Sequence, residues 1–130
     1  MDGWALWGVF VGGGLGSVVR FAVARWAQTY LVAHFPIATL AVNVAGCLLL
    51  GCLSAWLSQQ PDRVQAAYWQ AWLGVGFCGG LTTFSTFAAE LYALRAAAWL
   101  PWQYLLASLV LGVGAFAMGT LLTKGGLSGW

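Results

Sequence analysis

The chain has 130 residues, of which 62% are hydrophobic and only 6% are charged. A soluble domain carries about 25% charged residues, so this chain has too few charges to cover a water-exposed surface. The formal net charge of +2 is too small to indicate nucleic-acid binding, and no basic or acidic run occurs. The composition therefore predicts an integral protein of the lipid bilayer, and the length indicates a single domain.

Four apolar stretches are long enough to cross a membrane, which takes about 20 residues in a helix. They cover residues 4–25, 37–57, 69–98 and 102–123, with a tight turn expected at Leu100 and Pro101. The nine tryptophans fall near the ends of these stretches, where amphipathic rings favour the lipid headgroup zone. Because apolar residues do not alternate with a period of two, we predict an all-α membrane protein with four transmembrane helices.

The first span carries Gly8, Gly12 and Gly16, each four residues apart. On a helix these glycines form one smooth ridge, which allows another backbone to approach closely. Arg20 continues the ridge by one turn, so we expect a buried cation at a seam that faces the bundle. The alternative is a long side chain that extends to the membrane interface.

The second span places Thr39, Asn43 and Gly46 on one helix face by their spacing of four and three residues. Asn43 has two N–H donors and one carbonyl acceptor, and lipid satisfies none of them. On the residues alone, Asn43 is equally consistent with a bond between helices and with the wall of a polar pathway.

The third span is about 30 residues long, more than a straight helix needs to cross a bilayer. Four glycines between positions 74 and 80 lower the helix propensity of its middle, and Thr82 and Thr83 can bond to the backbone. We therefore expect a helix that is broken at its centre, around residues 79–82. Such a break frees carbonyl and amide groups, which membrane proteins use to bind ions near the midplane.

Polar residues are concentrated just after this expected break. Thr83, Thr86 and Glu90 share one helix face, and Ser85 lies beside them. Phe84 and Phe87 form a neighbouring pair, three residues apart. In lipid each polar group without a partner costs several kcal/mol, so the cluster must face protein or water. This alternation of hydroxyls and aromatic rings favours a transport pathway.

The fourth span carries Tyr104, Ser108 and Gly112 at successive steps of four residues, so two hydroxyls and a gap lie on one stripe. Taken alone, this stripe is as consistent with helix packing as with function.

Side-chain charge does not favour either orientation in the membrane. With four spans, Arg63 and Lys124 lie on one side and Arg25 and Arg95 on the other. The positive-inside rule then selects neither orientation. Copies inserted in opposite directions can pair, and four short helices are too few to enclose much of a pore alone. Both points favour an antiparallel homodimer.

Three stretches read GGGLGSVVR at 12–20, TLAVNVAG at 39–46 and GFCGGLTTFSTF at 76–87. Together with the chain length, the four spans and the lack of charge bias, these motifs resemble the CrcB/Fluc family of fluoride channels. The resemblance covers essentially the whole chain. It implies a passive fluoride-selective channel that exports fluoride from the cytoplasm through the cell inner membrane. It also implies a dual-topology dimer with two antiparallel pores.

The resemblance also implies roles for individual residues. The fluoride pathway would comprise Asn43, Thr83, Phe84, Ser85, Thr86, Phe87, Tyr104 and Ser108. A structural Na⁺ at the dimer centre would be held by the main-chain carbonyls of Gly79 and Thr82 from each subunit. Supporting positions would be Arg20, Glu90 and Thr39. Gly112 departs from the pattern, because some members of the family have another serine there.

The residue chemistry is consistent with these implied roles. Fluoride is small and tightly hydrated, so a selective path must replace its water with many close N–H and O–H donors. The edge of a phenylalanine ring carries the positive end of the ring quadrupole. Weak contacts at several sites let an anion leave again, whereas a strong cation in the pore would retain it.

Other functions are consistent with parts of the sequence. A small proton-coupled multidrug exporter could use Glu90, although such exporters usually carry their carboxylate in the first helix. An intramembrane enzyme could use Cys78 or Ser85 as nucleophile, but His34 lies in a loop and no base is evident. A purely structural protein would show no ion flux.

The three cysteines, Cys47, Cys52 and Cys78, all lie in apolar segments. Their odd number, the absence of a CxxC spacing and the single histidine argue against disulfides and metal clusters. We therefore expect cysteines that act as small packing residues.

Overall fold

The computed structural model describes residues 2–127, and within them it contains helices and no strand. Three long helices are α1 (Gly3–Tyr30), α2 (Ile37–Ser58) and α6 (Leu100–Leu127). Between α2 and α6 run α3 (Arg63–Trp69), the π-helix η1 (Gln70–Cys78), α4 (Gly79–Leu81), α5 (Phe84–Ala93) and the 3-10 turn η2 (Leu94–Ala96). Trp130, one of the nine tryptophans, lies outside the described residues.

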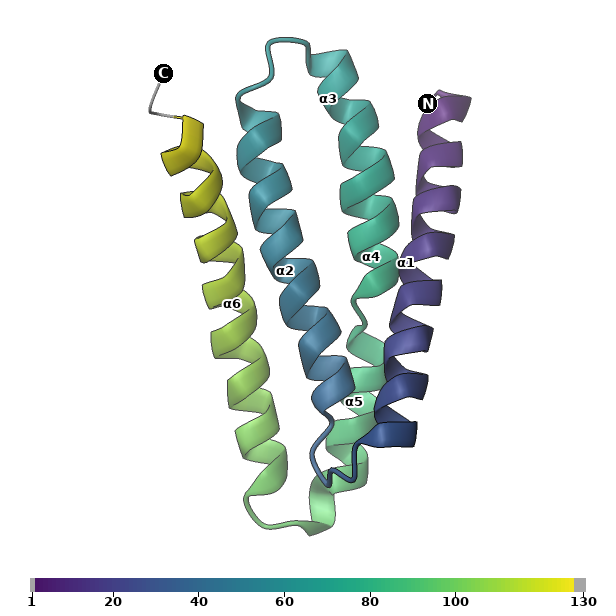
Figure 1. Ribbon diagram of the computed structural model, residues 1–130, viewed down its shortest axis with the longest axis vertical. Coiled ribbons are helices and arrows are strands. Elements are labelled where there is room, and N and C mark those ends of the chain that lie inside the picture. The colour runs from purple at the N-terminus through teal and green to yellow at the C-terminus, as the bar shows by residue number, and fades with distance from the viewer. Residues whose placement is uncertain (1, 128–130) are drawn as a thin grey trace.

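The helices α1, α2 and α6 are each long and apolar enough to cross a membrane. The elements α3, η1, α4 and α5 follow one another as a single broken column, residues 63–93, between α1 and α2 (Figure 1). The prediction of an all-helical, multi-pass membrane protein is confirmed. The fourth crossing, which would be made by the broken column, stays a prediction.

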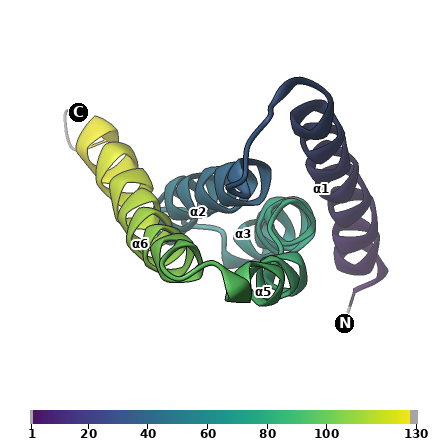
Figure 2. The same cartoon turned by 90° about the horizontal axis from the view of Figure 1, so that it is seen from below.

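The bundle consists of two closely packed halves. The helix α2 packs along α6, and α1 packs along η1 and α4. Viewed along the bundle, α1 and α6 lie on opposite sides, with α2 and the broken column between them (Figure 2). The beginning of α1 and the last described turn of α6 lie at the same end (Figure 1).

The glycine ridge of α1 faces the broken column, as the spacing predicted. Gly8, Gly12 and Gly16 are all buried. A Cβ atom at Gly12 would clash with the main-chain oxygen of Trp72, and one at Gly16 would clash with that of Phe77. Only glycine therefore lets the α1 backbone lie directly on the η1 backbone.

The broken column begins earlier than the sequence analysis predicted, at Arg63. The Asp62 carboxylate accepts hydrogen bonds from the main-chain N–H groups of Val64 and Gln65, at 2.9 and 3.1 Å. This is N-terminal helix capping, which satisfies donors that lack a partner inside the helix. An aspartate directly before the segment is the signal that would have located this start.

The tight turn predicted at Leu100 and Pro101 is wrong, because both residues belong to the first turn of α6. The chain bends instead at residues 97–99. Proline is tolerated in a first helical turn, where its missing N–H would have had no partner within the helix.

The interruption of the third segment also differs in position from the prediction. Gly79–Leu81 is still helical, whereas Thr82 and Thr83 have extended backbone. The glycines only weaken the helix. The two extended residues lie where a side chain from α2, that of Asn43, binds the backbone of Thr83.

Candidate functional site

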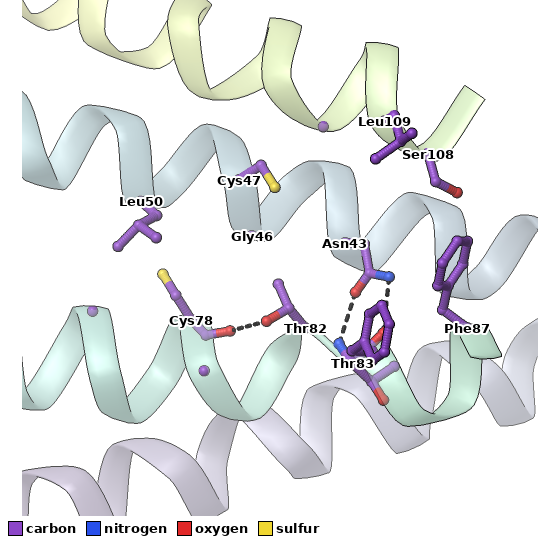
Figure 3. A pocket seen from close by; sticks show the side chains of 14 residues that line it. Asn43, Gly46, Cys47, Leu50, Cys78, Thr82, Thr83, Phe87, Ser108 and Leu109 are labelled. Carbon is purple, nitrogen blue, oxygen red and sulfur yellow. Dashed lines mark hydrogen bonds between the residues drawn. The ribbon is translucent and has the colours of Figure 1, made fainter. Parts of the chain in front are cut away.

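One side chain from α2 binds the backbone at the break in the broken column. The Asn43 amide donates to the Thr83 main-chain oxygen at 3.1 Å, and the Thr83 N–H donates to the Asn43 Oδ1 atom at 2.7 Å (Figure 3). The main-chain N–H and carbonyl of Thr83 therefore bond to Asn43 and not to backbone groups of a helix. Asn43 joins two helices and at the same time borders the space beside the break.

That space is a cavity of about 390 Å³, which we call the main cavity. Its walls come from α2, η1, the break, α5 and α6. Five of the predicted pathway residues line it: Asn43, Thr83, Phe84, Phe87 and Ser108. Figure 3 shows Asn43, Phe87 and Ser108 towards one end, with Leu50 and Cys78 towards the other.

The Ser108 residue on α6 lines this cavity, and its hydroxyl is buried. Its oxygen is buried and has no hydrogen-bond partner within the part of the chain that the structure describes. Buried side-chain hydroxyls in proteins are generally hydrogen-bonded, because leaving one unpaired costs about 1–3 kcal/mol. Ser108 therefore has an unused hydrogen-bond donor close to the wall of the cavity.

The two phenylalanines differ in their surroundings. Their ring centroids are 5.8 Å apart, with the planes inclined at 49°. Phe87 is 9% exposed and meets the ring of Tyr104 edge to face at 5.0 Å, whereas Phe84 is 79% exposed. Phe84 therefore places part of the wall of the main cavity at the surface of the chain.

The first turn of α5 gathers three hydroxyls. The Thr83 Oγ1 atom lies 3.2 Å from the Thr86 Oγ1 atom and 3.3 Å from the Ser85 hydroxyl oxygen, and it accepts a hydrogen bond from the Thr86 N–H. This caps the helix in the manner typical of threonine. Ser85 and Thr86 do not line the main cavity.

A second cavity of about 330 Å³ lies on the other side of the break. It is lined by Ser17, Arg20, Phe21, Ala24, Thr39, Val42, Thr83 and Thr86. Arg20 is half-buried, and its Nε atom donates to the Gly80 main-chain oxygen at 3.0 Å, so its side chain turns towards the broken column. Thr83 lines both cavities and is therefore the residue that they share.

Glu90 is separated from the hydroxyl cluster with which the sequence grouped it. Its two carboxyl oxygens accept hydrogen bonds from the Thr39 hydroxyl and from the Tyr104 hydroxyl, each at 2.7 Å. Tyr104 is fully buried and lines neither cavity. Sequence reasoning missed this network, which joins α2, α5 and α6. Thr39 lies one helical turn before Asn43, and Tyr104 lies one turn before Ser108. This spacing is the sequence signal that could have suggested the network.

Of the two predicted sodium ligands, Thr82 lies at the break, whereas Gly79 is helical and lies one turn before Thr83. In a regular helix the Gly79 carbonyl would accept from the Thr83 N–H, but that N–H donates to Asn43. The Thr82 carbonyl would accept from the Thr86 N–H, which donates to the Thr83 hydroxyl. Neither carbonyl receives its regular helical donor, but only Thr82 has unwound backbone. Unwound carbonyls in membrane proteins coordinate cations such as Na⁺.

Comparison with known proteins identifies the family. A family model described as "CrcB-like protein, Camphor Resistance (CrcB)" matches residues 7–120. The chain is 47% identical over 119 residues to "Fluoride-specific ion channel FluC 2" of Rhodococcus jostii, covering 89% of this chain and 96% of that protein. It is 42% identical over 118 residues to "Fluoride-specific ion channel FluC" of Azotobacter vinelandii, covering 89% and 94%. The chain therefore belongs to the CrcB family.

Proposed function

We propose that this chain is a fluoride-selective passive channel that exports fluoride from the cytoplasm across the cell inner membrane. Relatives named as fluoride-specific ion channels match along most of the chain. The observation that carries the proposal is the unpaired, buried Ser108 hydroxyl in a cavity that also holds Asn43 and Phe87. A hydroxyl donor and the positive edge of an aromatic ring are groups that can replace the water of a small anion.

In this proposal the anion passes from the second cavity to the main cavity beside Thr83, which lines both. Arg20 raises the local concentration of anions at the second cavity. The main cavity has no cationic side chain in its lining. An anion there meets only neutral donors, which bind weakly enough for it to leave.

We further propose that two copies pair in opposite orientations, forming two pores. The main cavity of one chain is open, and Phe84, on its wall, is 79% exposed. A second copy placed against this side would complete the wall. The carbonyl oxygens of Gly79 and Thr82 from both copies would hold Na⁺ at the centre, where the ion supplies a fixed positive charge that offsets anion repulsion.

The alternative of a proton-coupled multidrug exporter that uses Glu90 is not favoured. Both carboxyl oxygens of Glu90 are occupied by hydroxyls from α2 and α6. The relatives that match over most of the chain are named as fluoride channels.

The test is anion efflux from liposomes reconstituted at about one dimer each. We expect fast fluoride efflux without a proton gradient, and no comparable chloride efflux. Ser108→Ala should slow fluoride about tenfold to a hundredfold, because a hydrogen bond to an ion contributes about 1.5–3 kcal/mol. Phe84→Ile should slow it as well.

Matched controls are Ser54→Ala on α2 and Phe10→Ile on α1, since neither residue lines either cavity. Both control variants should conduct like the unaltered protein. Equal chloride flux, or undiminished fluoride flux in both Ser108→Ala and Phe84→Ile, would overturn the proposal.

A further inference from the structure

We propose that Gly112 and Cys47 set the width of the main cavity midway along its length, and so control the passage of a small anion. Gly112 has no side chain, which leaves a gap between α6 and the Cys47 sulfur atom that we call the notch. The effect on anion flux rests on the proposed function, whereas the existence of the notch does not.

The notch has room for one more side-chain carbon atom. A Cβ atom built at Gly112 lies 3.6 Å from the Cys47 Sγ atom, which is an ordinary van der Waals distance. Apart from its own helix, it has no other described atom within 4 Å. Gly112 is buried, and both residues line the main cavity. The missing side chain therefore enlarges the cavity.

Helix packing does not require a glycine at this position, although it does elsewhere between α2 and α6. A Cβ atom at Gly51 would clash with the Phe116 main-chain oxygen. One at Gly119 would clash with the Leu48 main-chain oxygen. At those two positions only glycine allows the two backbones to meet. At Gly112 a methyl group fits, and alanine has the higher helix propensity, so neither packing nor helix stability favours glycine.

The notch lies between the two ends of the main cavity. Figure 3 shows Cys47 between Asn43, which binds the break, and Leu50. On the opposite wall, Gly112 follows Ser108 by one helical turn of α6. An anion that enters the cavity at the break and continues towards Leu50 therefore passes the notch.

The side chains around the notch provide few donors for an anion. Leu50 and Leu109 are apolar parts of the cavity wall, and a thiol is only a weak donor. Burying an ion without partners is costly, so an anion at this point has to keep part of its water. Each water molecule takes about 30 Å³ of space. We therefore expect a side chain in the notch to displace that water and raise the barrier for the anion.

The first experiment tests the notch through stability. Gly112→Ala should unfold at the same temperature as the unaltered protein or above it, because the methyl group fits and alanine favours the helix. Gly119→Ala is the matched comparison on α6, and it should unfold earlier because its Cβ atom meets main-chain atoms. The measurement is thermal unfolding in one detergent, followed by circular dichroism. A lower unfolding temperature for Gly112→Ala than for the unaltered protein would overturn the notch.

The second experiment measures fluoride efflux from liposomes. Gly112→Ala should slow the efflux about tenfold, the change that about 1.4 kcal/mol of added barrier produces. The control is Gly114→Ala, because its Cβ atom has no described neighbour within 4 Å and Gly114 lines neither cavity. This control should conduct like the unaltered protein. Undiminished efflux in Gly112→Ala would overturn the role of the notch in transport.

A second substitution should reverse the effect of the first. Cys47→Ala removes the sulfur atom that faces the new methyl group, so Gly112→Ala/Cys47→Ala should conduct nearly as fast as Cys47→Ala alone. A role of Gly112 in helix packing would give no such recovery, and failure to recover would contradict the inference. If the unaltered protein shows no fluoride efflux, the proposed function is overturned instead, and the unfolding temperatures still decide whether the notch exists.

Discussion

At the scale of single residues, the site depends on side chains that bind backbone N–H and carbonyl groups in place of helical hydrogen bonds. Asn43 binds both the N–H and the carbonyl of Thr83, and the Thr83 hydroxyl accepts from the Thr86 N–H. Unpaired backbone groups in lipid cost several kcal/mol each, so these bonds would make a non-helical segment tolerable in the membrane crossing predicted for the broken column. The hydroxyls of Thr39 and Tyr104 donate to the two oxygens of the Glu90 carboxyl group, so this polar side chain also has partners.

Removal of the Tyr104 hydroxyl should destabilise the fold. Tyr104→Phe keeps the ring contact with Phe87 but leaves one oxygen of the half-buried Glu90 carboxyl group without its donor. We expect a loss of about 1 kcal/mol, since hydrogen bonds between membrane helices average about 0.6 and reach about 1.7 kcal/mol. The measurement is unfolding in detergent micelles, followed by circular dichroism.

Tyr92→Phe is the control for this substitution, because Tyr92 is 68% exposed. It keeps the ring over which the Arg95 guanidinium lies at 4.1 Å. Equal stability of Tyr104→Phe and Tyr92→Phe would show that the bond to Glu90 contributes nothing to the fold.

At the scale of elements, the positions of the glycines determine where two helix backbones can be in direct contact. The α1 ridge lies on η1, and a comparable contact joins α2 to α6, where a Cβ atom at Gly51 would clash with the Phe116 main-chain oxygen. Lipid is as apolar as the side chains, so close packing and polar contacts, rather than burial from water, hold membrane helices together.

Two alanine substitutions in the same helix should have opposite effects. In Gly12→Ala the new Cβ atom meets the main-chain oxygen of Trp72, which cannot move aside like a flexible side chain. Gly14→Ala places its Cβ atom where nothing lies within 4 Å, and alanine favours the helix by about 1 kcal/mol over glycine.

We therefore expect a lower unfolding temperature for Gly12→Ala and an unchanged or higher one for Gly14→Ala. Scanning both variants in the same detergent measures the difference. If Gly12→Ala unfolds no earlier than Gly14→Ala, the close approach of α1 to η1 is incorrect.

At the scale of the whole molecule, the proposed function requires a second chain. Phe84, on the wall of the main cavity, is largely exposed, and the two carbonyls proposed to bind Na⁺ lie at the break of a single column and just before it. The proposed antiparallel pair would close the cavity and bring the two breaks together. Oligomeric state and sodium binding should therefore change together.

Replacing Na⁺ with N-methyl-D-glucamine, a cation too large for carbonyl ligands, should lower the thermal stability of the pair and its fluoride flux. Single-molecule photobleaching should show two chains per complex in Na⁺. Substitutions of the Thr82 side chain do not test this, because the proposed ligand is its main-chain oxygen. Identical thermal stability and fluoride flux in the two cations would contradict the proposed Na⁺ site.

Composition and periodicity alone are enough to predict an all-helical membrane protein, because so few charges cannot cover a water-exposed surface. The spacing of Gly8, Gly12 and Gly16 likewise predicted a close helix contact, since a ridge needs only local periodicity. Tertiary structure decided where the third segment is interrupted and which groups satisfy Glu90. Those features depend on partners on other helices: Asn43 for Thr83, and Thr39 and Tyr104 for Glu90. A pattern within one helix defines a face, but only packing determines which side chain that face meets.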